Sequence, residues 1–121
     1  MDLGRRWIAS VALLAAVGCA STPKPVDTLA RSEASVRSAQ VMGAEQNPTA
    51  ALHLRLAQEE LQLARRKMSE GDNDRARYLL LRAQSDADLA LSLAQESRAQ
   101  DDASRAMQQM QSMQTQTGRG P

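Results

Sequence analysis

The chain has 121 residues, with 15 Lys and Arg against 14 Asp and Glu and a formal net charge of +1 at pH 7. This balance, without a clustered basic face, argues against a nucleic-acid partner. One cysteine and one histidine supply neither a disulfide framework nor the ligands of a zinc site. We therefore expect a non-enzymatic protein without catalytic residues, cofactor, metal or small-molecule substrate.

Residues 1–18 have the features of a lipoprotein signal peptide. Two arginines precede an apolar run of about a dozen residues, and the small Gly18 stands immediately before Cys19. The run is too short to cross a membrane as a helix, which needs about 20 residues. The tetrapeptide Ala16-Val17-Gly18-Cys19 resembles a bacterial lipobox. This resemblance implies cleavage between Gly18 and Cys19 and lipidation of the Cys19 thiol.

The residue after the cysteine bears on the membrane in which the protein resides. Position 20 is Ala, whereas an Asp there would favour retention in the inner membrane in enterobacterial-type sorting. The sequence therefore predicts a protein anchored to the outer membrane through lipid on Cys19 and facing the periplasm. Because each buried methylene contributes about 0.8 kcal/mol, several acyl chains on one cysteine make a durable anchor.

A tether and a first helix follow the cysteine. Residues 19–26 contain two prolines and no periodicity, so we expect a flexible tether there. Helix is predicted over residues 27–46, and Pro48 disfavours its continuation. This helix has a thin apolar line, which consists of Leu29, Val36, Ala39 and Gly43.

Helices over residues 48–71 and 73–105 carry the clearest pattern in the chain. Small and apolar residues alternate at spacings of four and three, a seam of period 3.5. The seam of the second helix is Ala50, Leu54, Ala57, Leu61, Ala64, Met68 and Gly71. The seam of the third is Ala76, Leu80, Ala83, Ala87, Ala90, Ala94 and Ser97. A short turn joins the two helices into an antiparallel hairpin.

With the first helix alongside this hairpin, the expected fold is all-α, a slender three-helix bundle over residues 27–105 with coiled-coil-like seams. His53, the only histidine, directly precedes the seam residue Leu54, and we expect it at a boundary or in solvent. Residues 106–121 are rich in Gln and Met and are expected to be disordered. The alternative is a helix over residues 99–113.

Such a helix would form a possible partner surface, because methionines suit adaptable contacts and an exposed apolar stripe marks interaction sites. Its methionines are Met107, Met110 and Met113. The shifted seam that continues beyond Ser97 consists of Ala99, Ala103, Ala106, Met110 and Met113.

The hairpin also carries a family resemblance over residues 47–95. Its matching residues are Pro48, Leu54-x-x-Ala57, Leu61-x-x-Ala64, Gly71, Ala76-x-x-Leu79, Ala83 and Asp86-Ala87-x-Leu89-Ala90. In these the chain resembles the alanine-rich bacterial outer-membrane lipoproteins of the domain of unknown function 4398. That domain often stands before an OmpA-like peptidoglycan-binding domain, and the resemblance brings no catalytic residues to this chain.

Together these features predict a lipid-anchored structural or protein-interaction module on the periplasmic side of the outer membrane. Its expected partner is an envelope protein or a second copy of the chain. Two alternatives remain open at this point. One is a tetratricopeptide-like periplasmic adaptor, in which Tyr78 would supply the aromatic contact. The other is a peptidoglycan-associated accessory lipoprotein.

Overall fold

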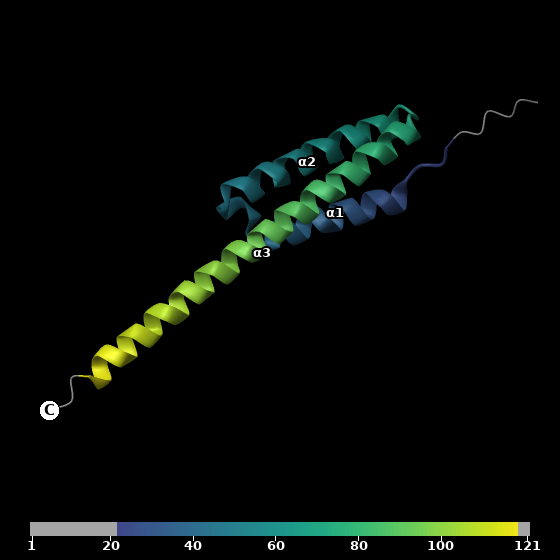
Figure 1. Ribbon diagram of the computed structural model, residues 1–121. Helices are drawn as coiled ribbons and strands as arrows, with labels where there is room; N and C mark the ends of the chain where they lie inside the picture. Colours follow the sequence, from purple (N-terminus) through teal and green to yellow (C-terminus); the bar gives the residue numbers. More distant parts are fainter. Residues whose placement is uncertain (1–21, 119–121) are drawn as a thin grey trace, which may run out of the picture.

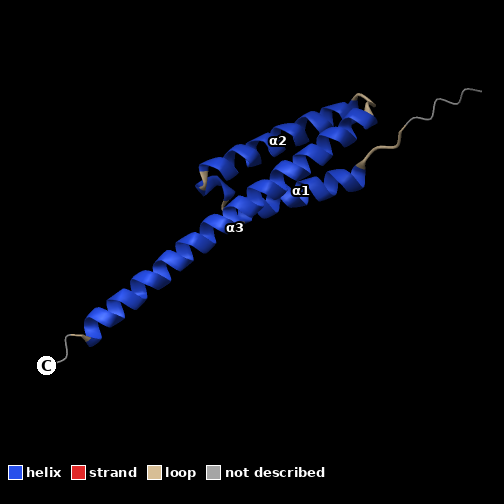
Figure 2. Cartoon of the chain, in the orientation of Figure 1, coloured by secondary structure: helices blue, strands red, loops and turns tan. Residues whose placement is uncertain are grey.

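The computed structural model describes residues 22–118. The chain forms α1 (Val26–Val41), a short 3-10 helix η1 (Ala44–Gln46), α2 (Pro48–Ser69) and α3 (Asn73–Thr117). Helices α2 and α3 form an antiparallel hairpin with α1 packed alongside (Figure 1), and the described part of the chain contains no strand (Figure 2). The all-α three-helix bundle expected from the sequence is confirmed.

The helix boundaries follow from local chain chemistry. Helix α1 ends at Val41 rather than at residue 46, because Gly43 turns the chain in the left-handed region with φ 84°. Asn47 then caps α2: its Oδ1 accepts the backbone N–H groups of Thr49 and Ala50, both at 3.0 Å. At the next turn Gly71 has φ 81°, and Asp72 Oδ1 accepts the N–H of Arg75 at 3.2 Å.

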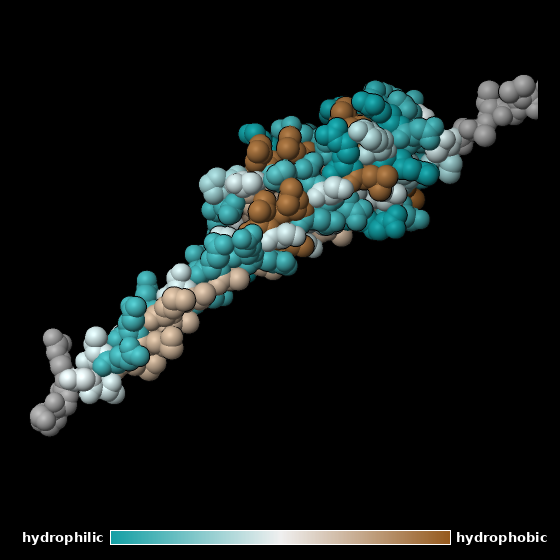
Figure 3. All heavy atoms as spheres, viewed as in Figure 1, coloured by the Kyte–Doolittle hydropathy of each residue, from teal (hydrophilic) through white to brown (hydrophobic). Residues whose placement is uncertain are grey.

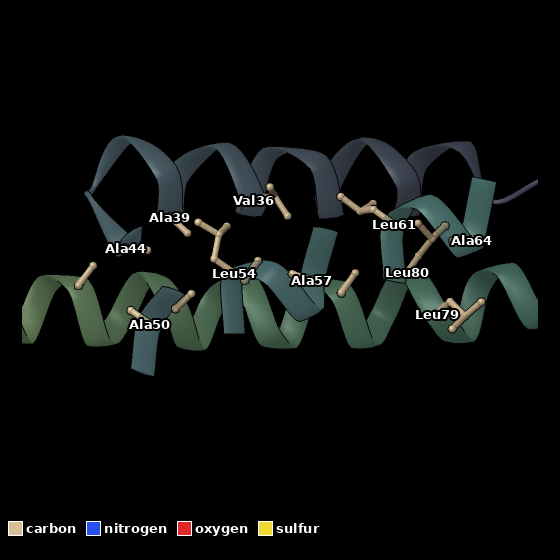
Figure 4. Close-up of a cluster of buried hydrophobic side chains, with 14 residues drawn as sticks. Val36, Ala39, Ala44, Ala50, Leu54, Ala57, Leu61, Ala64, Leu79 and Leu80 are labelled. Carbon is tan, nitrogen blue, oxygen red and sulfur yellow. The ribbon is translucent and has the colours of Figure 1, made fainter. Parts of the chain in front are cut away.

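Most residues of the seams predicted in α2 and α3 form the core. Met68 and Ser97 are only half-buried, and Gly71 is exposed in the turn between the helices. Side chains from all three helices point toward one another in the centre of the core (Figure 4). The buried residues of α2 and α3 are Ala50, Leu54, Ala57, Glu60, Leu61, Ala64, Ala76, Leu79, Leu80, Ala83, Ala87, Ala90 and Ala94. Small side chains at these positions allow the helices to approach closely, while the leucines contribute most of the buried apolar area.

Helix α1 packs through a polar residue that the sequence pattern missed. Ser32 is 0 % exposed, and its Oγ lies 2.8 Å from the Leu80 carbonyl oxygen of α3 and 2.9 Å from the Thr28 carbonyl oxygen. Because a buried hydroxyl is tolerated when it donates a hydrogen bond, a serine can occupy the centre of this contact. The predicted line was wrong at Gly43, which lies in the turn after α1.

Helix α3 continues well beyond its partners (Figure 1). The expectation of disorder over residues 106–121 is wrong for residues 106–117, which are helical; residues 119–121 lie outside the described range. Gln, Met and Ala are good helix formers, and a helix that is already nucleated needs only propagation. We call residues 98–117 the overhang, and all of its residues are exposed.

Candidate functional site

The first described residues, which follow the predicted lipid anchor in the sequence, lie against the bundle. Gly18 and Cys19 lie outside the described residues, but the segment that follows them, residues 22–25, lies against the turn between α2 and α3. Thr22 Oγ1 donates to Asp74 Oδ2 at 3.1 Å, and Asn73 Nδ2 donates to the Thr22 carbonyl oxygen at 2.6 Å. We call residues 22–25 the strap.

The strap corrects part of the tether prediction. Pro25 is buried and precedes the first residue of α1, and Thr22 is held by the two hydrogen bonds to α3. Of the tether expected over residues 19–26, residues 22–25 thus lie against the bundle, and residues 19–21 lie outside the described residues. Thr22, the first described residue, lies at the end of the bundle where α2 meets α3.

The overhang lies at the opposite end of the molecule from the strap (Figure 1). Its methionines Met107, Met110 and Met113 are 61 %, 57 % and 58 % exposed. We call these three side chains the methionine face. A tan band of moderately hydrophobic residues runs along the overhang in Figure 3. The residues that sequence analysis named as a partner surface are therefore helical, accessible and uncovered by the rest of the bundle.

A polar cluster joins α2 to α3 within the bundle. His53 Nδ1 lies 2.8 Å from Asp86 Oδ1, and Arg82 Nη2 lies 2.7 Å from Glu60 Oε1. The side chains of His53 and Asp86 are 25 % and 22 % exposed, so the boundary position expected for His53 is confirmed. Sequence reasoning missed the cluster, because Glu60 reads as an ordinary charged residue beside the seam residue Leu61.

Burial perturbs the ionisation of Glu60. Desolvation raises its pKa above the ordinary value of 4.5, the neighbouring Asp86 raises the pKa further, and Arg82 opposes the shift. Glu60 Oε2 is buried and accepts no hydrogen bond from the described residues. Protonation of Glu60 therefore relieves the cost of a buried charge and lets its carboxyl group donate to Asp86.

The cluster makes stability depend on pH with a definite sign. A carboxyl whose pKa is higher in the folded than in the unfolded state favours folding below about pH 4.5, and this contribution is lost as the pH rises through the folded-state pKa. Glu60→Gln is neutral at every pH. Relative to wild type, this variant should therefore gain free energy of unfolding as the pH rises above about 4.5, as urea titrations will measure.

The neighbouring Glu59→Gln is the matched control, because it removes the same charge from a side chain that is 66 % exposed. This control should follow the wild-type pH profile. Parallel profiles for Glu60→Gln and wild type would contradict the assignment of the buried carboxyl.

Among the described residues His53 pairs with Asp86. Among residues 22–118 no group of three His, Cys, Asp or Glu side chains is placed to hold a metal ion. The serine hydrogen bonds found in that range run to backbone carbonyls, such as that of Ser85 Oγ to the Leu81 carbonyl at 3.1 Å, and none reaches His53. The arrangement is that of a structural link between two helices.

The outward side of α3 carries the aromatic residue considered for an adaptor. Tyr78 is 52 % exposed, and the guanidinium carbons of Arg75 and Arg82 lie 5.6 and 5.9 Å from its ring centroid. Tyr78 also lines a shallow depression with Leu81 and Leu89. The ring thus has cationic neighbours within its own helix.

Comparisons with known proteins place the described helices in one family. A family model described as a domain of unknown function, DUF4398, matches residues 27–106. This match extends the region of resemblance beyond residues 47–95 to include α1. No curated protein and no solved structure shows significant similarity to the chain. No helix among residues 22–118 is long and apolar enough to span a membrane.

Proposed function

This chain belongs to the DUF4398 family, and from that premise we propose that it is a lipid-anchored, non-enzymatic envelope protein. It acts as a structural or protein-interaction module on the periplasmic side of the outer membrane, held there by lipid on Cys19. The observation that carries the proposal is the lipobox-like Ala16-Val17-Gly18-Cys19 with Ala20 after it. The anchor is tested by replacing Cys19, as argued in the Discussion.

The shape of the described bundle supports the interaction part of this proposal. The strap and the overhang mark opposite ends, so a molecule anchored near its strap would carry the methionine face away from the anchor. A helix of 45 residues is about 68 Å long at 1.5 Å per residue. Exposed methionines at its far end suit contact with an envelope protein or a second copy.

The two alternative functions have less support. A tetratricopeptide-like array requires about three repeats for stability, whereas the described residues form one hairpin with one additional helix. The peptidoglycan-associated alternative depends on the neighbours that the domain has in other proteins.

Truncation after Arg98 tests the overhang. The hairpin should stay folded, because the last buried residue of α3 is Ala94, while cross-links to partners or to a second copy in intact envelopes should be lost. Replacing all three methionines of the methionine face by glutamine should give the same loss with the helix length retained. Gel patterns after chemical cross-linking measure both variants.

A matched control replaces Gln108, Ser112 and Thr115 by alanine, which alters as many positions on the opposite face of the overhang. This control should preserve the cross-links. Unchanged cross-linking in the truncated protein would show that the overhang is not an interaction site.

A further inference from the structure

The strap limits how far the bundle can stand from a membrane that holds Cys19. From Cys19 to Thr22 the chain advances by three residues, a span of at most about 11 Å when fully extended. Thr22 is hydrogen-bonded to Asn73 and Asp74 at the start of α3. The turn between α2 and α3 must therefore lie close to the site of lipid insertion.

That end of the bundle has a surplus of cations. The strap, the first two turns of α1, the last turn of α2 and the first turns of α3 contribute six basic residues and four acidic ones. The basic residues are Lys24, Arg31, Arg66, Lys67, Arg75 and Arg77, and the acidic residues are Asp27, Glu70, Asp72 and Asp74. We call these ten residues the basic end. Figure 3 shows mostly hydrophilic residues around this end of the bundle.

Three of the four carboxylates of the basic end have a donor within the protein. Glu70 Oε2 lies 2.6 Å from Lys67 Nζ, Asp72 accepts the N–H of Arg75 at 3.2 Å, and Asp74 accepts the hydroxyl of Thr22 at 3.1 Å. Lys24, Arg66 and Arg77 are exposed, as these carboxylates are. Because this end has two more cations than carboxylates, cations remain available to an external anion.

The overhang lacks this bias. Arg98 and Arg105 are matched by Asp101 and Asp102, and residues 106–118 contain no charged side chain. The molecule therefore has an electrostatic polarity along its long axis, positive at the strap and neutral at the methionine face.

We infer that the basic end rests on anionic phospholipid headgroups, so that the bundle stands with the α2–α3 turn toward the membrane and the overhang directed away. This inference rests on the proposed lipid anchor. Lipid on Cys19 holds the molecule at the surface, and the basic end selects its orientation. A basic side chain near an anionic surface interacts with it within a Debye length, about 8 Å at physiological ionic strength.

The orientation can be measured in the full-length lipidated protein in vesicles. Because the Cys19 thiol is blocked by lipid, one cysteine introduced at Ser69 or at Thr115 can carry a fluorophore, and both positions are exposed. Vesicles of phosphatidylcholine and phosphatidylglycerol contain a headgroup-attached spin label as quencher. The probe at Ser69 should be quenched and the probe at Thr115 should not, with less contrast in phosphatidylcholine alone.

A charge variant tests which headgroups are recognised. Arg66→Gln combined with Arg77→Gln should reduce the equilibrium constant for headgroup contact by about fivefold for each cation removed. The phosphatidylglycerol-dependent part of the quenching at Ser69 reports this loss. Arg98→Gln combined with Arg105→Gln removes the same charge from the overhang and should have no effect. Equal quenching at both probe positions, or quenching at Ser69 insensitive to phosphatidylglycerol and to the charge variant, would overturn the inference.

The measured mass of the protein and its flotation with the vesicles distinguish a wrong orientation from failure of the lipid anchor. If the protein carries lipid and floats with the vesicles while its probes lack the expected contrast, the anchor stands and the orientation is wrong. If the protein carries no lipid and does not float, the proposed anchor fails and the inference fails with it.

Discussion

Replacing Cys19 by alanine is expected to abolish lipidation, to block cleavage by the lipoprotein signal peptidase and to move the protein out of the membrane fraction. The physical reason is that the thiol is the only cysteine nucleophile in the chain that can form the thioether to diacylglycerol. Without acyl chains the anchor loses about 0.8 kcal/mol for every methylene that was buried. Metabolic labelling with a palmitate analogue and fractionation of the envelope measure the two effects directly.

Ser21→Ala is a suitable control, because it changes another small residue after the cleavage site without touching the lipid acceptor. This variant should be labelled and processed like wild type. A Cys19→Ala protein that still incorporates the analogue, or a wild-type protein that never does, would refute the anchor. Any association of the bundle with the membrane would then depend on protein contacts alone.

The helices and the hairpin could be predicted from the sequence because they depend on residues that are close together in the chain. In α2 the seam residues Ala50, Leu54, Ala57, Leu61 and Ala64 are all buried. A spacing of four and three places these positions on one helical face, and two such faces joined by a short turn can only pack against each other as a hairpin. The turn itself follows from Gly71, whose φ of 81° is costly for other residues.

Polar residues in the packing could not be predicted, because their partners are distant in sequence. Ser32 looks unsuited to a core until the Leu80 carbonyl, 48 residues away, is placed 2.8 Å from its hydroxyl. Glu60 similarly depends on Arg82 of the neighbouring helix. A periodicity based only on hydrophobicity assigns such positions to the solvent-exposed faces of the helices.

At both ends of the molecule the structure differs from what the sequence suggested. The prolines of the strap suggested a flexible tether, yet hydrogen bonds to Asn73 and Asp74 fix its first described residue. Residues 106–117 lacked apolar residues for a core and suggested disorder, yet they continue a helix that the hairpin has nucleated. Contacts with α3 decided the first segment, and propagation of an existing helix decided the second.

The close approach of the helices predicts a large effect of Ala83→Leu on stability. Ala83 is 0 % exposed and belongs to the core cluster, so a larger side chain must push the helices apart or adopt a strained rotamer. Overpacking of this kind costs about 1–3 kcal/mol. For a bundle of this size each kcal/mol lowers Tm by roughly 4–8 °C, which circular dichroism melts will resolve.

Ala99→Leu supplies the matched control, since it makes the same change on the same helix at an exposed position of the overhang. Without neighbours to displace, this leucine should alter the free energy of unfolding by no more than about 0.5 kcal/mol. If Ala83→Leu melted like Ala99→Leu, the space at Ala83 would be larger than the seam requires. The alanines would then reflect helix propensity rather than close packing of the three helices.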